Sequence, residues 1–165
     1  LSFSKSKNYK KEKMYMLKNN FIILLITFIF FQVSSLANED KFLSLKKNKV
    51  NVRYGPGFDF PIKYIYKKIN LPIKQIDKKE NFRRIIDFKK NSGWIHISQL
   101  KKVNSVIADE DKILFGKSTI FSNPVAKIKR GRLLIVKKCE KDWCKVETEG
   151  LKGWVFKKNL WGAVD

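Results

Sequence analysis

The chain has 165 residues, of which 36 are basic and 15 acidic, so its formal net charge at pH 7 is +21. Its two cysteines and one histidine do not make a zinc ligand set, so neither a metal nor a cofactor is expected. Only five basic residues are arginine, and base or phosphate recognition favours the guanidinium fork, so a nucleic-acid partner is not expected either.

The high positive charge has two interpretations, and composition does not decide between them. A field of this size attracts anionic partners such as lipid headgroups or wall polymers. A lysine-rich composition also gives solvated strand faces with no selected partner, and here the lysines are spread along the whole chain.

The N-terminal segment has the pattern of an export signal. Four lysines between Lys10 and Lys18 precede an apolar run at 21–31, and Ser35-Leu36-Ala37 places small side chains at the −3 and −1 positions of a cleavage site. This predicts a helical signal peptide over 1–37, cleaved after Ala37, and a periplasmic or secreted mature protein. The alternative is a retained anchor, although a spanning helix needs about 20 apolar residues.

The start of translation is a separate question. A start at Met14 or Met16 would give a more ordinary signal length, so residues 1–13 need not be translated and are left out of the fold.

After residue 40 the hydrophobic period is two, which predicts strands. Alternating segments at 62–66, 71–76 and 82–88 are separated by turn residues, and the first of them follows the strong turn signal Gly55-Pro56-Gly57. Short strands of this kind, closely spaced and broken by glycine and asparagine, are typical of small all-β barrels or sandwiches.

A repeat then predicts two copies of one module. Gly93-Trp94-Ile95 returns as Gly153-Trp154-Val155, with a leucine six residues after each tryptophan. An aromatic residue also begins the preceding strand in each copy, and side chains on one face of a hairpin can pack together. We therefore expect the repeated core to be formed by Phe82, Trp94, Leu100, Trp143, Trp154 and Leu160.

The residues that carry a family resemblance are Val50-Asn51-Val52-Arg53-Tyr54-Gly55-Pro56-Gly57 together with the late Gly93-Trp94-Ile95. This pattern resembles the bacterial SH3-like (SH3b) domain. The mature chain, from about Lys49 to Gly162, is similar to exported tandem SH3-like proteins of Gram-negative bacteria. In those proteins the second copy carries a Cys…Trp-Cys hairpin and ends in Leu-Trp-Gly, as Cys139, Trp143-Cys144 and Leu160-Trp161-Gly162 do here.

The resemblance implies an all-β protein with two tandem five-stranded barrels, which we place at 49–102 and 112–162. The residues between them, an apolar patch followed by the acidic run, predict a short linker at 103–111 that can add an edge strand. It also implies binding to peptidoglycan peptides or to other proteins, and no catalysis. The second copy lacks the Asn-Val-Arg-x-Gly-Pro-Gly stretch, and the first has Lys78 and Arg83 near the positions of the cysteines.

The two cysteines favour a disulfide. Cys139 and Cys144 flank four residues, and a hairpin there would place their Cα atoms about 5.5 Å apart, which suits the bond in an oxidising compartment. The rival interpretation is a catalytic cysteine paired with His96, the only histidine, which lies in the other copy.

A ligand site is expected around the glycine-proline turn of the first copy. Tyr54, Phe58, Tyr64 and Tyr66 are its candidate residues, since SH3-like barrels grip extended peptides in an aromatic groove. The alternative is that Phe58 and Phe60 fold over the barrel as additional core.

Three functions therefore enter the comparison with the structure. The first is a non-catalytic exported protein that binds peptidoglycan or an envelope protein. The second is charge-mediated association with anionic envelope lipids, and the third is a cell-wall hydrolase, for which the acidic run at 109–111 would have to be more than a solvated linker. The sequence specifies neither the ligand nor the oligomeric state.

Overall fold

The computed structural model describes residues 41–162, and every regular element in this range except one short turn is a strand. The predicted signal peptide over 1–37 and its cleavage site after Ala37 lie outside the described residues. Within residues 41–162, no helix is long and apolar enough to cross a bilayer.

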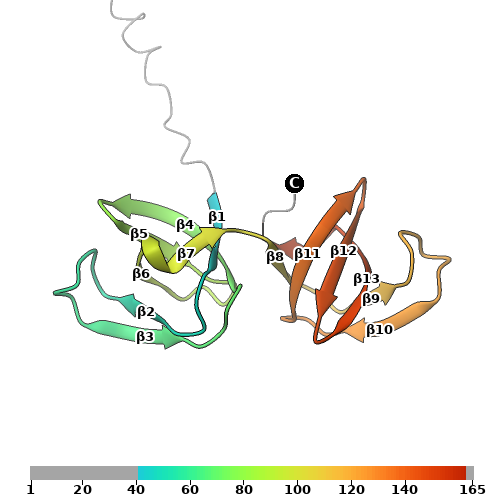
Figure 1. Ribbon diagram of the computed structural model, residues 1–165, viewed down its shortest axis with the longest axis horizontal. Helices are drawn as coiled ribbons and strands as arrows, with labels where there is room; N and C mark the ends of the chain where they lie inside the picture. The colour runs from blue at the N-terminus through green and yellow to red at the C-terminus, as the bar shows by residue number, and fades with distance from the viewer. Residues whose placement is uncertain (1–40, 163–165) are drawn as a thin grey trace, which may run out of the picture. The chain divides into compact units, whose positions relative to one another are not determined.

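The first module, residues 41–102, is one antiparallel sheet of seven short strands in the order β3-β2-β6-β5-β4-β1-β7 (Figure 1). Its strands are β1 (Lys41–Leu45), β2 (Val50–Arg53), β3 (Ile62–Tyr66), β4 (Pro72–Lys79), β5 (Phe82–Ile86), β6 (Ser92–His96) and β7 (Leu100–Lys102). A 3-10 helix, η1 (Ile97–Gln99), separates the last two.

The second module, residues 105–162, repeats this topology strand for strand, in the order β10-β9-β13-β12-β11-β8-β14. Its strands are β8 (Ser105–Ala108), β9 (Lys112–Phe115), β10 (Pro124–Ile128), β11 (Leu133–Glu140), β12 (Trp143–Thr148), β13 (Leu151–Phe156) and β14 (Leu160–Trp161). The predicted all-β class and the duplication are both confirmed.

The number of strands differs from the five that the resemblance implies. In the first module a bend at 46–49 divides the opening strand, so that β1 pairs with β4 and β7 while β2 pairs with β3 and β6. In the second module the turn at 109–111 divides β8 from β9 in the same way. One long bent strand is thereby counted as two in each copy.

The expected linker is also shorter than predicted. β8 is fully buried and lies between β11 and β14, so it is an interior strand of the second sheet and not an edge strand. Only Val103 and Asn104 separate β7 from β8.

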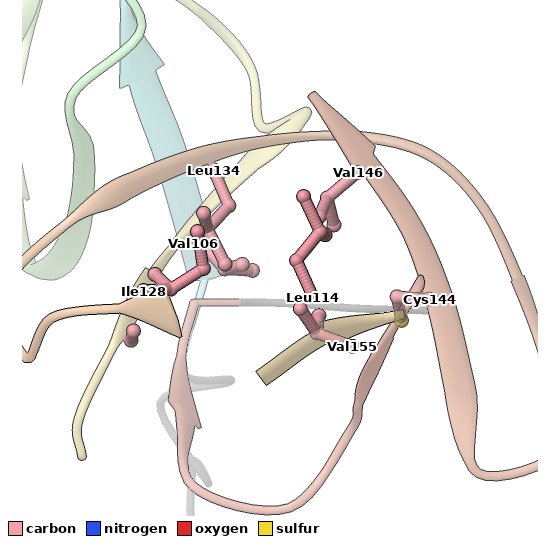
Figure 2. Close-up of a cluster of buried hydrophobic side chains, with 8 residues drawn as sticks. Val106, Leu114, Ile128, Leu134, Cys144, Val146 and Val155 are labelled. Carbon is pink, nitrogen blue, oxygen red and sulfur yellow. The ribbon is translucent and has the colours of Figure 1, made fainter. Parts of the chain in front are cut away.

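Each module has its own apolar core. The first is formed by Leu45, Val50, Val52, Ile73, Ile85, Ile95 and Leu100. The second is formed by Val106, Ala108, Leu114, Ile128, Leu134, Cys144, Val146 and Val155. Figure 2 shows these side chains, which come from each of the strands β8 through β13. These cores use the inward positions of the alternating pattern.

The prediction that the repeated tryptophans lie in the core is wrong. Trp94, Trp143 and Trp154 are only half-buried, while Ile95 and Val155 next to them are fully buried. Glycine explains the phase: a Cβ on Gly93 would lie 2.4 Å from the Val52 side chain, so the inward position has no room for a larger residue. Period two then turns the tryptophan outward.

The other three predicted core residues are closer to expectation. Phe82 and Leu100 are buried, and Leu160 is half-buried against the second core. The core of this fold is therefore made of aliphatic side chains, with the repeated aromatic residues around its outside.

Candidate ligand-binding site

The first loop of the first module, residues 54–61 between β2 and β3, is held in place by a single arginine. Arg53, the last residue of β2, donates from Nη1 to the carbonyl oxygens of Phe58 at 3.1 Å and Phe60 at 2.5 Å. Its guanidinium carbon also lies 5.5 Å from the centre of the Phe58 ring. The arginine of the Asn-Val-Arg stretch thus orders the loop from inside.

Glycine lets the loop fold tightly against itself. A Cβ on Gly55 would lie 2.3 Å from the Phe60 ring, so only glycine allows that ring to pack on the backbone. Backbone hydrogen bonds from Tyr54 to Pro61 (3.2 Å) and from Gly57 to Gly55 (3.1 Å) close the loop.

This order places Phe58 over two residues of the β5–β6 hairpin. Its ring centre lies 5.2 Å from that of Phe82 and 5.1 Å from that of His96, and these two residues are directly opposite each other in the sheet. We call Phe58, Phe82 and His96 the aromatic cluster. His96 is fixed by a 2.8 Å hydrogen bond between Nδ1 and the Ser98 hydroxyl.

The aromatic cluster is open to solvent on its loop side. Tyr54 is 63% exposed and Phe58 is 65% exposed, although both lie in an ordered loop. Lys63 lies 5.6 Å from the centre of the Tyr54 ring and adds positive charge beside it. The structure thus combines large, fixed, exposed aromatic side chains with cationic neighbours.

Tyr64 and Tyr66 lie elsewhere. Both pack against the first core, and the Tyr66 hydroxyl donates to Asp87 Oδ2 at 2.9 Å, while Asn91 donates to the same carboxylate from its backbone N–H and its amide. Burial, followed by the neighbouring Tyr64, raises the pKa of Tyr66 far above its usual range. The four predicted ligand residues are therefore not brought together.

Two residues that support the exposed Phe58 ring were expected in other roles. Phe82 was expected in the core, and His96 was considered only as a catalytic partner for a cysteine. Their register opposite each other, which a hairpin around residues 87–91 requires, is the sequence signal that pairs them.

The second module has an equivalent cluster with a different composition. Trp143 and Phe156 are opposite each other, as Phe82 and His96 are, and both Phe115 and Phe156 stack on Trp143 with ring centres 5.7 and 5.5 Å away. Its first loop, residues 116–123, exposes Phe121 by 92% and Ile120 by 66%. In this module the loop presents its apolar side chains to solvent.

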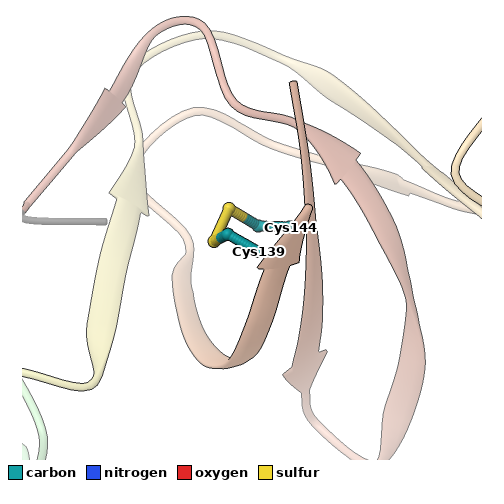
Figure 3. The surroundings of a disulfide bond; sticks show 2 residues. All are labelled: Cys139 and Cys144. Atoms are coloured by element: carbon teal, nitrogen blue, oxygen red, sulfur yellow. A yellow bond between two sulfur atoms is a disulfide. The ribbon is translucent and has the colours of Figure 1, made fainter. Parts of the chain in front are cut away.

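The predicted disulfide joins Cys139 and Cys144 at the tip of the β11–β12 hairpin (Figure 3). The two residues are opposite each other, with Cα atoms 4.0 Å apart, because the turn contains only Lys141 and Asp142. At the same place in the first module, Lys78 is opposite Arg83. With both thiols used in this bond, neither is available to act as a nucleophile with His96.

Each carboxylate of the acidic run at 109–111 is paired with a basic residue of the second module. Asp109 pairs with Arg130 at 3.1 Å, Glu110 with Lys112 at 3.0 Å, and Asp111 accepts from the backbone N–H of Arg130 at 2.9 Å. That N–H, aided by Lys129 and Lys127, lowers the pKa of Asp111 to about 2. Within residues 41–162 no three histidine, cysteine or acidic side chains gather at metal-binding distance.

A family model agrees with this architecture. The bacterial SH3 domain model matches residues 46–102 and again residues 122–162, one match in each module. The chain belongs to the bacterial SH3 domain family. Bacterial SH3 domains are binding modules, typically of the cell wall, and this protein carries two of them in tandem.

Two solved structures are similar to this tandem SH3 protein, NlpC2 and NlpC1 from Trichomonas vaginalis. The NlpC2 match has 9% identity and a TM-score of 0.35, and covers 75% of this chain and 48% of that one. The NlpC1 match has 11% identity and a TM-score of 0.35, and covers 77% and 47%. The chain thus spans about half of their length, and a likeness this low carries no argument about function. No curated protein matches the chain.

Proposed function

We propose that this protein is an exported, non-catalytic binding protein whose first module grips an extended peptide, either in peptidoglycan or on an envelope protein. One observation carries the proposal: the Arg53 hydrogen bonds hold Phe58 exposed beside Phe82 and His96, and Tyr54 is exposed in the same loop. A surface that is ordered before binding loses little conformational entropy when a ligand arrives.

The chemistry of this surface supports a peptide ligand. Tyrosine and arginine are residue types that dominate binding energy at interfaces, and aromatic grooves suit extended chains. Peptidoglycan stem peptides carry carboxylates, and Arg53 and Lys63 lie beside the exposed rings. Cationic neighbours of this kind favour encounter with an acidic peptide.

Export is part of the proposal and rests on two features. The first is the signal pattern at 1–37. The second is the disulfide between Cys139 and Cys144, a bond that forms and persists in oxidising compartments such as the periplasm.

The test uses residues 38–165 and purified bacterial sacculi. We expect the protein to co-sediment with sacculi, and both Phe58→Ala and Tyr54→Ala to weaken this binding at least ten-fold. Phe121→Ala, which removes an exposed ring from the other module, is the matched control and should bind like the parent. Equal losses in all three variants would contradict a site on the first module.

The two peptide sources are separated by a second measurement. If the parent protein stays in the supernatant, peptidoglycan is excluded as the source. A photo-crosslinking residue at position 58 in intact cells should then give one discrete adduct. The same residue placed in the second module should not give this adduct. Failure of both measurements would reject the proposed function.

A second candidate function, contact with anionic envelope lipids, is favoured by the second module. Ile120 and Phe121 extend from a loop that contains Lys117 and no acidic residue. Apolar side chains beside basic ones suit the interface of an anionic bilayer. Binding to acidic liposomes should fall steeply with added salt and be lost in Phe121→Ala, while Phe58→Ala should have no effect.

A further inference from the structure

A cavity of about 630 Å³ lies among turns and strand ends, and no residue of either aromatic cluster lines it. The first module contributes the β3–β4 turn, with Lys67, Lys68 and Asn70, together with Lys101 of β7. The second module contributes alternate residues of β11 and the β12–β13 turn. Both modules belong to the same compact unit, Glu39–Asp165. This volume is in the range of small-molecule sites.

The charge in this cavity is positive and only partly neutralised. Glu149 pairs with Arg132, and Glu147 pairs with Lys137 at 3.0 Å, so each carboxylate already has a cationic partner. Lys67, Lys68 and Lys101 have no carboxylate within salt-bridge distance among residues 41–162. Three uncompensated ammonium groups therefore surround one cavity, which favours an anion.

One residue that lines this cavity, Asn70, has a buried side-chain oxygen with no hydrogen-bond partner. Asn70 Oδ1 is the one buried side-chain nitrogen or oxygen in the described part of the chain that makes no hydrogen bond. A buried polar atom without a partner costs about 1–3 kcal/mol, so such atoms are rare in folded proteins.

The backbone of Asn70 is held in place and cannot easily move to satisfy this oxygen. Its backbone is in the left-handed region (φ 60), its N–H donates to the Leu45 carbonyl at 3.0 Å, and its own carbonyl accepts from the Ser105 hydroxyl at 2.5 Å. Ser105 is in turn hydrogen-bonded to Ser44 at 3.0 Å. The backbone of Asn70 is therefore fixed where the two modules meet, at the wall of a cavity that attracts negative charge.

From these observations we infer that the cavity binds an anionic sugar unit, phosphorylated or carboxylated, with the lysines holding the anion and the Asn70 side chain rotating so that its unpartnered Oδ1 accepts a hydroxyl or amide hydrogen of the ligand. Polar lining by asparagine, threonine and lysine suits a hydrophilic ligand, and Ile69, Leu133 and Ile135 can contact the C–H face of a sugar ring. Lysine provides point charges without the bidentate geometry of arginine, so the site would accept either anion. The inference does not depend on the peptide site in the first module.

The experiment measures binding to residues 38–165 by calorimetry at low salt. The probes are glucose 6-phosphate, glucuronate, glucose and inorganic phosphate. We expect at least one of the two anionic sugars to bind at least ten-fold more tightly than both glucose and inorganic phosphate. The tighter binder of the two then shows whether the natural ligand is a phosphorylated or a carboxylated sugar.

Two variants and one control locate the site. The triple substitution Lys67→Gln, Lys68→Gln, Lys101→Gln should weaken binding of the anionic sugar at least ten-fold. Asn70→Gly keeps the left-handed backbone and should weaken sugar binding about five-fold without changing phosphate binding. The control, Lys78→Gln, Lys117→Gln, Lys145→Gln, removes the same charge elsewhere, and thermal unfolding checks that all variants fold.

Several results would overturn the inference. One is the absence of binding by both anionic sugars. Another is inorganic phosphate binding as tightly as the sugars, which would mean an adventitious ion only. An equal loss in the control triple variant would show that the total charge of the protein, and not this cavity, attracts the ligand.

Discussion

The first loops of the two modules occupy the same place in the same topology but are ordered by different means. In the first module Arg53 is paired with Trp94 and holds the loop through its guanidinium; in the second, Phe115 is paired with Trp154 at the same position. There the loop is held by hydroxyl groups, with Ser122 Oγ accepting from the Lys117 N–H at 2.9 Å and Thr119 Oγ1 accepting from the Phe121 N–H at 3.3 Å.

This difference shows which parts of the duplicated module were free to diverge. The strands share their order, their register at the equivalent hairpins and their inward glycines. The loops share none of their contacts, so one covers its aromatic cluster with Phe58 and the other extends Phe121 into solvent. A common frame thus carries two different surfaces.

The largest expected effect tests the common frame. A Cβ at Gly153 would lie 2.6 Å from the Phe115 carbonyl oxygen, and at Gly93 it would lie 2.4 Å from the end of the Val52 side chain. Because the nearest backbone oxygen is closer at Gly153 (Phe115, 2.6 Å) than at Gly93 (Arg53, 3.0 Å), Gly153→Ala should lose about 3 kcal/mol and Gly93→Ala about 1–2 kcal/mol in urea unfolding. Gly116→Ala, with no atom closer than 3.4 Å, is the control and should change little.

The next effect tests what only the second module has. Replacing Cys139 and Cys144 together by serine should lower the free energy of unfolding by about 2 kcal/mol, because a short closed loop constrains the unfolded chain modestly. The equivalent pair in the first module, Lys78 and Arg83, provides the control double substitution to serine, which should cost less than about 1 kcal/mol. Similar costs at both hairpins would argue against a stabilising role for the bond.

A smaller effect separates the two loops. Arg53→Gln removes both hydrogen bonds to the loop carbonyls and should cost about 1 kcal/mol, with faster amide exchange at residues 54–60 and none of this change at residues 116–123. Arg84→Gln, on an exposed position of β5, serves as the control. Unchanged amide exchange in the first loop would show that Gly55 and the backbone hydrogen bonds are enough to keep the loop ordered without Arg53.

The smallest expected effect concerns the stability of the fold at low pH. The folded-state pKa of Asp111 is lowered to about 2, below the unfolded value of about 4, so its contribution is complete above the unfolded value and is lost as the pH falls from about 4 through 2. Asp111→Asn should therefore flatten the loss of stability between pH 4 and 2. Asp59→Asn, which removes a carboxylate with no cationic partner among residues 41–162, should leave that slope unchanged.

The sequence predicted the fold through local signals that survive duplication. The Gly-Trp repeat, the period of two and the turn residues between strands gave the class and the two copies, and the spacing of Cys139 and Cys144 gave the disulfide. The sequence did not show which residues of the two Gly-Trp strands point inward, since an alternating pattern fits either face of a sheet. The size of the tryptophans suggested the inside, whereas the close approach of Val52 to Gly93 decides for the glycine.

The candidate sites depend on contacts that sequence spacing does not contain. Arg53 reaches the carbonyls of residues five and seven positions later only because the loop folds back on it. Tyr64 and Tyr66 were predicted to contact the ligand. Instead, Asp87 and Asn91, more than twenty residues later in the chain, form a hydrogen-bonded network with Tyr66. The cavity around Asn70 is formed by turns from both modules, which no local pattern brings together.

The short connection between β7 and β8 has a consequence for any ligand that repeats its binding unit. With only Val103 and Asn104 between the two sheets, a polymer strand held by one module would meet the other at an effective concentration on the order of millimolar. Two weak individual contacts could then give long residence on a repetitive surface, and rapid release from a fragment that carries a single unit.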